Sequence, residues 1–204
     1  AWPPIAPRPL PPAPLSAVFA FYRACCSVTA SNNGLGIGLN EITLSVATSS
    51  GSAVSGTTTV SNVDIYAYTD SNFSSPVSGF TDGLIDDNSG GIAAEAEYEF
   101  SSVLQIPAGA TYYFKVVGDV TLTNGTGTFS GNLTTKLLGD SAFPVSSATL
   151  MLNETNADAL AADDDFIWSP NSTTTSATTD IDWTNGYGVP GLPSAGLSGS
   201  VLSK

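Results

Sequence analysis

The sequence predicts an all-β fold in which two sheets pack face to face as a sandwich. Apolar and polar residues alternate over short runs, for example residues 42–46 and 63–68, and this period of two is typical of a strand with one buried face. Clusters of Gly, Asn, Asp and Ser separate the runs at a spacing typical of β-sandwiches. Apolar spacing that suits a helix is confined to residues 92–97 and 154–162, where short helical turns are expected.

The first 14 residues, AWPPIAPRPLPPAP, are dense in proline. Proline lacks a backbone N–H and fixes its φ angle, so these residues can form neither a helix nor a central strand. We expect them to run as an extended polyproline arm.

Residues 15–28, LSAVFAFYRACCSV, form the most continuously apolar and aromatic stretch of the chain. The stretch is shorter than the roughly 20 residues that cross a bilayer as a helix, and a pilin-like helix would carry no proline block in front. Three interpretations stay open: the remainder of a signal peptide, a first strand of the chain's own sheet, or a donor strand inserted into a neighbouring subunit. The donor-strand interpretation predicts an interface made by Leu15, Val18, Phe19, Phe21, Tyr22 and Val28, with Phe19 and Phe21 as anchors.

The middle of the chain predicts further strands, and the whole sequence divides into three predicted segments. Residues 98–106 pass through Pro107-Ala-Gly109 into residues 111–122, the strongest β stretch. Asn124-Gly125 favours a hairpin turn, so residues 126–138 are predicted to return as the second strand of a β-hairpin. We predict an arm and donor-type strand over residues 1–28, a β-sandwich of immunoglobulin-like or jelly-roll type over 29–162, and an extended tail packed on it over 163–204.

Composition limits the function. The chain has no His, and five Lys and Arg stand against 18 Asp and Glu, a net charge of −13. Histidine is the usual acid–base side chain near neutral pH and nucleic-acid binding needs clustered cations, so we predict no enzyme, no catalytic residue and no nucleic-acid partner. A charged fraction of 11% leaves a surface of hydroxyls and amides, which suits an extracellular protein. Adjacent Cys25 and Cys26 suit neither an ordinary disulfide nor a zinc site.

Acidic and aromatic residues offer weaker hypotheses. Several acids could supply oxygen ligands to calcium, but none forms an ordered calcium loop, so we predict solvated loops and no cofactor; these are Asp82, Asp86, Asp87, Asp163, Asp164, Asp165, Asp180 and Asp182. A carboxylate pair for glycoside hydrolysis arises easily by chance among 18 acids. Large aromatics could bind sugar rings, although core positions are the commoner use: Tyr112, Tyr113, Trp168, Trp183 and Tyr187.

Five Asn-X-Ser/Thr sequences mark possible glycan acceptors on exposed loops. The asparagines are Asn72, Asn124, Asn132, Asn153 and Asn171. A chain this rich in Ser and Thr also produces such sequences by chance.

Two parts of the chain resemble known proteins. Residues 60–68 (VSNVDIYAY), 104–109 (LQIPAG) and 112–119 (YYFKVVGD) resemble immunoglobulin-like β domains of bacterial surface proteins. The tail, with FIWSPN at 166–171 and DWTNGYGVPGLP at 182–193, is similar to the C-terminal ends of uncharacterised bacterial secreted proteins. The resemblance spans residues 42–197 and implies an extracellular structural role, with no catalytic residues.

These observations predict a structural subunit of an extracellular filament or surface layer on the cell surface, with other copies of the chain as its partners. The proposed mechanism is strand exchange, in which residues 15–28 of one copy complete the sheet of the next. A monomeric adhesin or carbohydrate-binding sandwich, with a cell-surface polysaccharide as its partner, is the alternative, and a secreted glycoside hydrolase is less favoured. No membrane span is expected.

Overall fold

The structure is a computed structural model that describes residues 15–32, 34–51, 56–92, 95–124, 130–143, 164–171, 183–197 and 199–203. Residues 15–25 and a few other strand residues are described by their backbone alone. The described elements are β1 (Leu15–Thr29), β2 (Ile37–Gly51), β3 (Gly56–Tyr68), the 3-10 turn η1 (Thr81–Gly83), β4 (Leu84–Ile92), β5 (Glu95–Ile106), β6 (Thr111–Asn124), β7 (Ser130–Leu137), β8 (Phe166–Ser169) and β9 (Ser200–Ser203).

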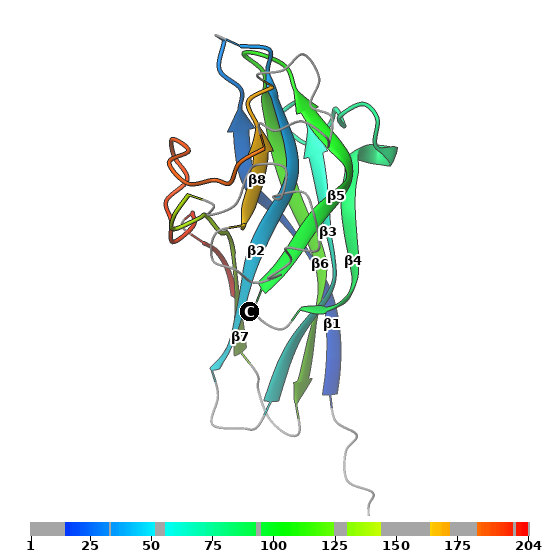
Figure 1. Ribbon diagram of the computed structural model, residues 1–204. Helices are drawn as coiled ribbons and strands as arrows, with labels where there is room; N and C mark the ends of the chain where they lie inside the picture. The colour runs from blue at the N-terminus through cyan, green and yellow to red at the C-terminus, as the bar shows by residue number, and fades with distance from the viewer. Residues whose placement is uncertain are drawn as a thin grey trace, which may run out of the picture.

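The strands form two antiparallel sheets, which confirms the predicted all-β class (Figure 1). The first sheet has the order β1-β6-β3-β4, and the second has the order β5-β2-β7-β9, with β8 as an additional partner of β2. The immunoglobulin-like or jelly-roll type stays a prediction, because two antiparallel sheets are common to both.

The central strand of the second sheet is β2, which has β5 on one side and both β8 and β7 on the other. Its pairing shifts between Leu39 and Glu41, a β-bulge that both neighbours share. An extra residue in a strand changes which side chains face the core. Leu39 and Ile42 therefore both enter the core, while Glu41 lies between them in sequence.

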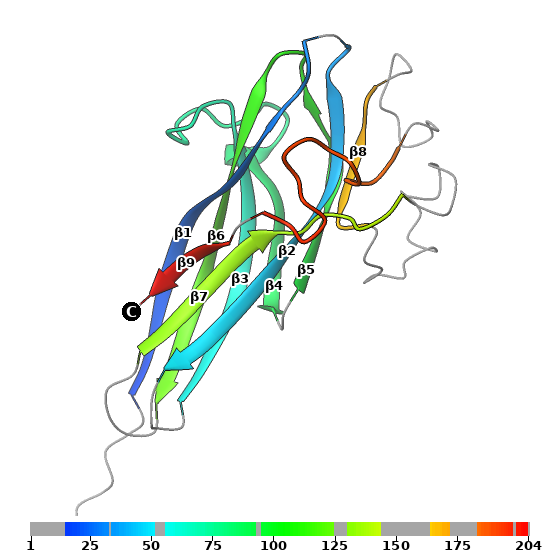
Figure 2. The ribbon, with the colours of Figure 1, turned by 90° about the vertical axis from the view of Figure 1, so that its left-hand side faces the viewer.

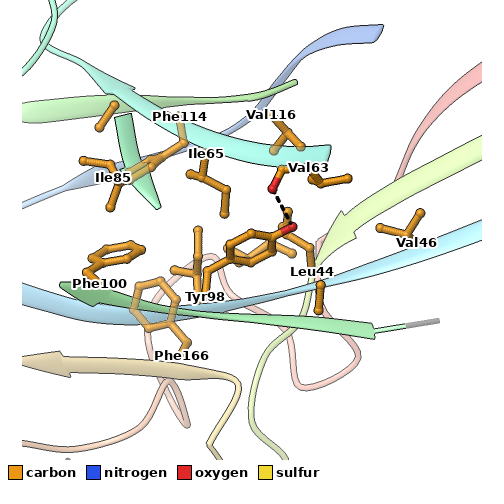
Figure 3. Close-up of a cluster of buried hydrophobic side chains, with 14 of the residues drawn as sticks. Leu44, Val46, Val63, Ile65, Ile85, Tyr98, Phe100, Phe114, Val116 and Phe166 are labelled. Carbon is orange, nitrogen blue, oxygen red and sulfur yellow. Dashed lines mark hydrogen bonds between the residues drawn. The ribbon is translucent and has the colours of Figure 1, made fainter. Parts of the chain in front are cut away.

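The core lies between the two sheets, where apolar side chains of both meet (Figure 3). Ile65 and Val63 of β3 and Phe114 of β6 face Leu44 of β2 and Tyr98 of β5, and all five are almost completely buried. The Tyr98 hydroxyl donates a hydrogen bond of 3.2 Å to the Val63 carbonyl oxygen. This bond ties the sheets together across their apolar interior.

The predicted hairpin over residues 111–138 is wrong. β6 and β7 lie in different sheets, because β6 pairs with β1 on one edge and β3 on the other. With both edges of β6 occupied, β7 pairs instead with β2 and β9. Asn124-Gly125 correctly predicted the end of a strand, but it did not predict which strand β7 pairs with.

The expected helical turn at residues 92–97 is also wrong, because β4 continues to Ile92 and β5 begins at Glu95. From Glu95 to Phe100 the side chains alternate between exposed and buried, so a period of two prevails. The tight connection after β5 is confirmed, since the Ala110 amide donates to the Pro107 carbonyl oxygen at 2.9 Å. The other expected helical turn, at residues 154–162, lies outside the described residues.

The C-terminal tail adds strands to the second sheet. β8 pairs with β2 between Gly38 and Ile42, and β9 pairs with β7 between Asn132 and Thr135 (Figure 2). Residues 183–197 form a loop between them whose Thr184 exchanges two backbone hydrogen bonds of 2.9 Å with Trp168. The tail thus takes part in the sheet as well as packing on it.

Candidate functional site

The first candidate site is the edge formed by β1. This strand runs antiparallel to β6 from the pair Leu15 and Asn124 to the pair Thr29 and Thr111. Within the described residues β6 is its only strand partner, so the other side of β1 is a sheet edge. The register shifts between Ala24 and Cys26, which makes Cys25 the extra residue of a bulge. A bulge disrupts the hydrogen-bond ladder locally, and an edge strand has a row of backbone groups without a strand partner.

The connection from β1 to β2 is a turn against the β5–β6 connection. The Ala30 amide donates to the Ala110 carbonyl oxygen at 3.0 Å, and the Gly109 amide donates to the Ala30 carbonyl oxygen at 3.1 Å. Gly36 has a φ of 92° and its α-carbon faces the Ile106 carbonyl oxygen, where a β-carbon would not fit. The described residues between these anchors, 31–32 and 34–35, are exposed.

The predicted donor-strand residues all lie on β1. For Leu15, Val18, Phe19, Phe21 and Tyr22 the structure describes the backbone alone, and it pairs them with β6 of the same chain. Val28 is half-buried and packs against the core. The strand therefore occupies the chain's own sheet, which is one of the interpretations that the sequence left open.

A polar network that the sequence did not reveal holds the tail in place. The Asp140 side chain is buried and accepts hydrogen bonds from the backbone amides of Asp165, at 2.8 Å, and Gly186, at 2.6 Å. The Asn185 side-chain nitrogen donates to the Ala142 carbonyl oxygen at 2.8 Å. These bonds join the segment after β7 to both parts of the tail.

Most of the large aromatic residues occupy core or half-buried positions, which is the use that the sequence favoured over an aromatic platform. Trp183 is fully buried, and the Trp168 indole nitrogen donates to the Asn185 carbonyl oxygen at 2.9 Å. Tyr112 and Tyr113 are half-buried on β6. Tyr187 alone of the five is exposed, and its ring meets the exposed ring of Phe143 edge to face at 4.6 Å. Sequence reasoning missed Phe143, which has no motif around it.

A second unpredicted feature is a group of acids on the outer face of the second sheet. Glu41 is only 7% exposed, and its Oε1 atom has no hydrogen-bond partner. Glu99 lies directly opposite Glu41 on β5, and Glu97 lies opposite the neighbouring Thr43. The only sequence signal was an acid inside an apolar run, Leu39-Asn-Glu-Ile42.

Among the acids considered as calcium ligands, those that the structure describes lie on separate segments. Asp82 lies in the η1 turn and Asp86 and Asp87 on β4, whereas Asp164 and Asp165 precede β8. Asp163, Asp180 and Asp182 fall outside the described residues. Over the part of the chain that the structure describes, no group of three or more acidic or Cys side chains is arranged to hold a metal ion.

Burial of the Asp165 carboxyl, helped by the nearby charge of Asp140, raises its pKa to about 6. Burial likewise raises the pKa of Asp64 and Asp86 on the first sheet. In each case burial is the largest cause, because removing a carboxylate from water favours its neutral form.

Of the predicted glycan acceptors, Asn72 and Asn132 are exposed. Asn171 is buried and its side-chain nitrogen donates to the Gln105 side-chain oxygen at 3.1 Å, so the expectation of an exposed acceptor fails there. The side chain of Asn124 and all of Asn153 lie outside what the structure describes.

Comparison of the chain with protein-family models, with curated proteins and with solved structures gave no match. The described residues include no helix with the length and hydropathy that a membrane crossing requires.

Proposed function

We propose that the chain is a structural subunit of an extracellular filament or surface layer, assembled by exchange of β1 between neighbouring copies. The observation that carries the proposal is the place of β1 at the edge of its sheet, where it pairs with β6 along its whole length apart from one bulge. A second copy presents the same β6 edge, so its partner strand can be supplied by either chain. Strand addition of this kind is an established way for chains to associate.

Exchange of β1 between copies conserves the contacts that the strand makes within one chain. Each β1–β6 pair lost within a chain is replaced by the same pair between chains, so burial and ladder hydrogen bonds are conserved. An empty β6 edge, by contrast, would leave unpaired backbone groups and uncovered apolar surface. The conformational change is then concentrated in residues 30–36, where β1 joins β2.

Exchange of this kind gives an open assembly. A copy that gives β1 to one neighbour accepts β1 from another, and such head-to-tail contacts form a filament unless their rotation closes a ring. A surface with few charged groups and abundant hydroxyls helps copies approach, because desolvation and like-charge costs are small. Extracellular location is part of the proposal and is supported by the same composition.

Two truncations test the proposal. Removal of residues 1–29 leaves a chain that can accept β1 but cannot donate it, whereas removal of residues 1–14 leaves β1 intact. We expect electron microscopy to show filaments for the shorter truncation and none for the longer one. A peptide of residues 15–29 should bind the longer truncation and raise its melting temperature, because it refills the β6 edge.

The longer truncation should also act as a chain terminator when mixed with the intact chain. Small amounts should shorten the filaments, and the effect should disappear when the peptide is added first. Filaments of unchanged length and number from the longer truncation would refute exchange of β1.

One observation supports the alternative function as an adhesin. Phe143 and Tyr187 form an exposed aromatic pair, and exposed rings can stack on sugars. A polysaccharide that binds the intact chain, and binds the Tyr187→Ala variant at least about tenfold more weakly, would support this function. Trp183→Ala is not a suitable test, because Trp183 is part of the interior.

A further inference from the structure

Glu41 is a carboxyl group in an unusual place, because it is buried on a central strand. Its exposed fraction is 7%, and it lies between β5 on one side and β8 on the other. Acidic side chains are almost never this buried unless they are paired. On β8 the residue opposite Glu41 is Ile167, which offers no charge.

The charged groups that act most strongly on Glu41 are themselves acidic. Glu97 and Glu99 face it from β5, and Asp164 faces it from the segment before β8. The two lysines whose side chains are described bind elsewhere, with Lys115 over the rings of Tyr66 and Tyr68 and Lys136 donating to the Ala195 carbonyl oxygen.

Glu97 is the neighbouring acid whose charge acts most strongly on Glu41. An ionised carboxylate has no proton to donate, so a hydrogen bond between two carboxyl groups requires one of them to be protonated. The Oε1 atom of Glu41 is buried without a partner. A buried oxygen without a partner is costly as a charged group and much less costly as part of a neutral acid.

We propose that Glu41 and Glu97 share one proton that fastens β5 to β2, so that the fold is tightest in acid and loosens as the pH rises. The inference concerns the folding of a single chain and does not depend on the proposed function. Burial, followed by the charges of Glu97 and Asp164, raises the pKa of Glu41 from 4.5 to about 9.

The direction of the pH effect follows from that pKa. Below pH 4.5 the Glu41 carboxyl is protonated in both the folded and the unfolded chain, and its contribution to stability is complete. Between pH 4.5 and about 9 the unfolded chain has released the proton and the folded chain has kept it, so stability falls as the pH rises. Asp165, whose pKa is raised to about 6, also makes stability fall as the pH rises, but over a lower pH range.

The test is the melting temperature between pH 6.5 and 8.5, above the titration of Asp165. For the intact chain we expect a fall of about 5–10 °C across this range. Glu41→Gln, which has the shape of the protonated acid, should reduce this fall to less than half. Asp82→Asn is the matched control, because it removes one charge at an exposed turn position with a φ of 53° that Asn tolerates.

A second variant keeps the test decisive if Glu41→Gln fails to fold. Glu97→Gln removes the negative charge that acts most strongly on Glu41. The pH at which Glu41 titrates, followed by carbon NMR of the carboxyl group, should therefore move down by at least about 1 unit. Amide exchange corrected for intrinsic rates should quicken with pH along β5 more than along β3.

Three results would overturn the proposal. One is a melting temperature with the same pH dependence in the intact chain and in Glu41→Gln. Another is an NMR titration of Glu41 near its ordinary value. The third is a rise in the melting temperature when calcium is added at pH 8 that Glu41→Gln abolishes, since the acids would then form a cation site instead of a proton-sharing pair.

Discussion

The two ends of the described chain both complete sheets, but they are held by different forces. β1 lies along one edge of β6 through ladder hydrogen bonds and apolar packing, with Thr29 and Thr111 meeting at its end through hydroxyl groups 2.8 Å apart. The tail is held by buried, directional contacts, in which Asp140 accepts two backbone amides and Trp183 fills the interior. Because every copy has the same β6 edge, β1 can make the same contacts with another copy of the chain.

The contrast suggests which end exchanges and which stays. An identical edge on another copy can replace the β1–β6 ladder without loss. The tail must break its buried polar network before it can leave, and each buried group left without its partner destabilises the fold. The four predictions that follow test this difference, from the largest expected effect to the smallest.

Trp183→Ala should have the largest effect on the free energy of unfolding. Trp183 is fully buried, and loss of such a side chain costs about 3–5 kcal/mol because a cavity remains. Urea denaturation would measure the loss, and amide exchange should quicken first at Thr184 and Trp168, whose backbones pair. A loss below about 1 kcal/mol would mean that the tail is not locked by its interior contacts.

Asp140→Ala should lower the free energy of unfolding by about 2–3 kcal/mol, because two buried backbone amides lose their acceptor. Asp82→Asn, which removes an exposed charge, serves as the control and should change stability by less than about 0.5 kcal/mol. Equal effects of the two substitutions in urea denaturation would show that charge, and not the network, explains the loss.

Tyr98→Phe should cost about 1 kcal/mol, the usual contribution of one hydrogen bond, since it removes the donor to the Val63 carbonyl oxygen but keeps the ring. This variant gives a reference value for the substitutions in β1 and in the tail, because Tyr98 joins the two sheets and belongs to neither end of the chain. Thermal unfolding would measure the change. No change would indicate that the hydroxyl is equally well satisfied in another way.

Thr29→Val should have the smallest effect, about 0.5 kcal/mol or less, because the hydroxyl pair with Thr111 is exposed. Val is also a good strand residue, which offsets part of the loss. A cost above about 2 kcal/mol in urea denaturation would place a specific lock at the end of β1 and weaken the contrast with the tail.

The sequence predicts the all-β class because alternation along residues 42–46 and 63–68 is a local property, and both runs lie in strands. Strand partners are not local, which is why the hairpin over residues 111–138 was wrongly predicted. Nothing in Asn124-Gly125 shows that both edges of β6 are already occupied.

The candidate sites were predicted less well, for the same physical reason. Asp140 and Glu41 are ordinary acids in the sequence, and their importance comes from burial and from neighbours that are distant in the chain. For Trp183 the sequence left a sugar-binding role open but favoured a core position, and the structure buries it. Patterns near one residue predict its strand, but not what covers it.

The most direct test of the central claim mixes two variants, each carrying Cys25→Ala and Cys26→Ala. One variant has Thr29→Cys and the other Thr111→Cys, two positions whose hydroxyl groups are 2.8 Å apart in the structure. Exchange of β1 predicts that oxidation after co-assembly yields disulfide-linked pairs containing one chain of each kind. Absence of mixed pairs, with closure inside single chains when both substitutions are combined, would contradict it.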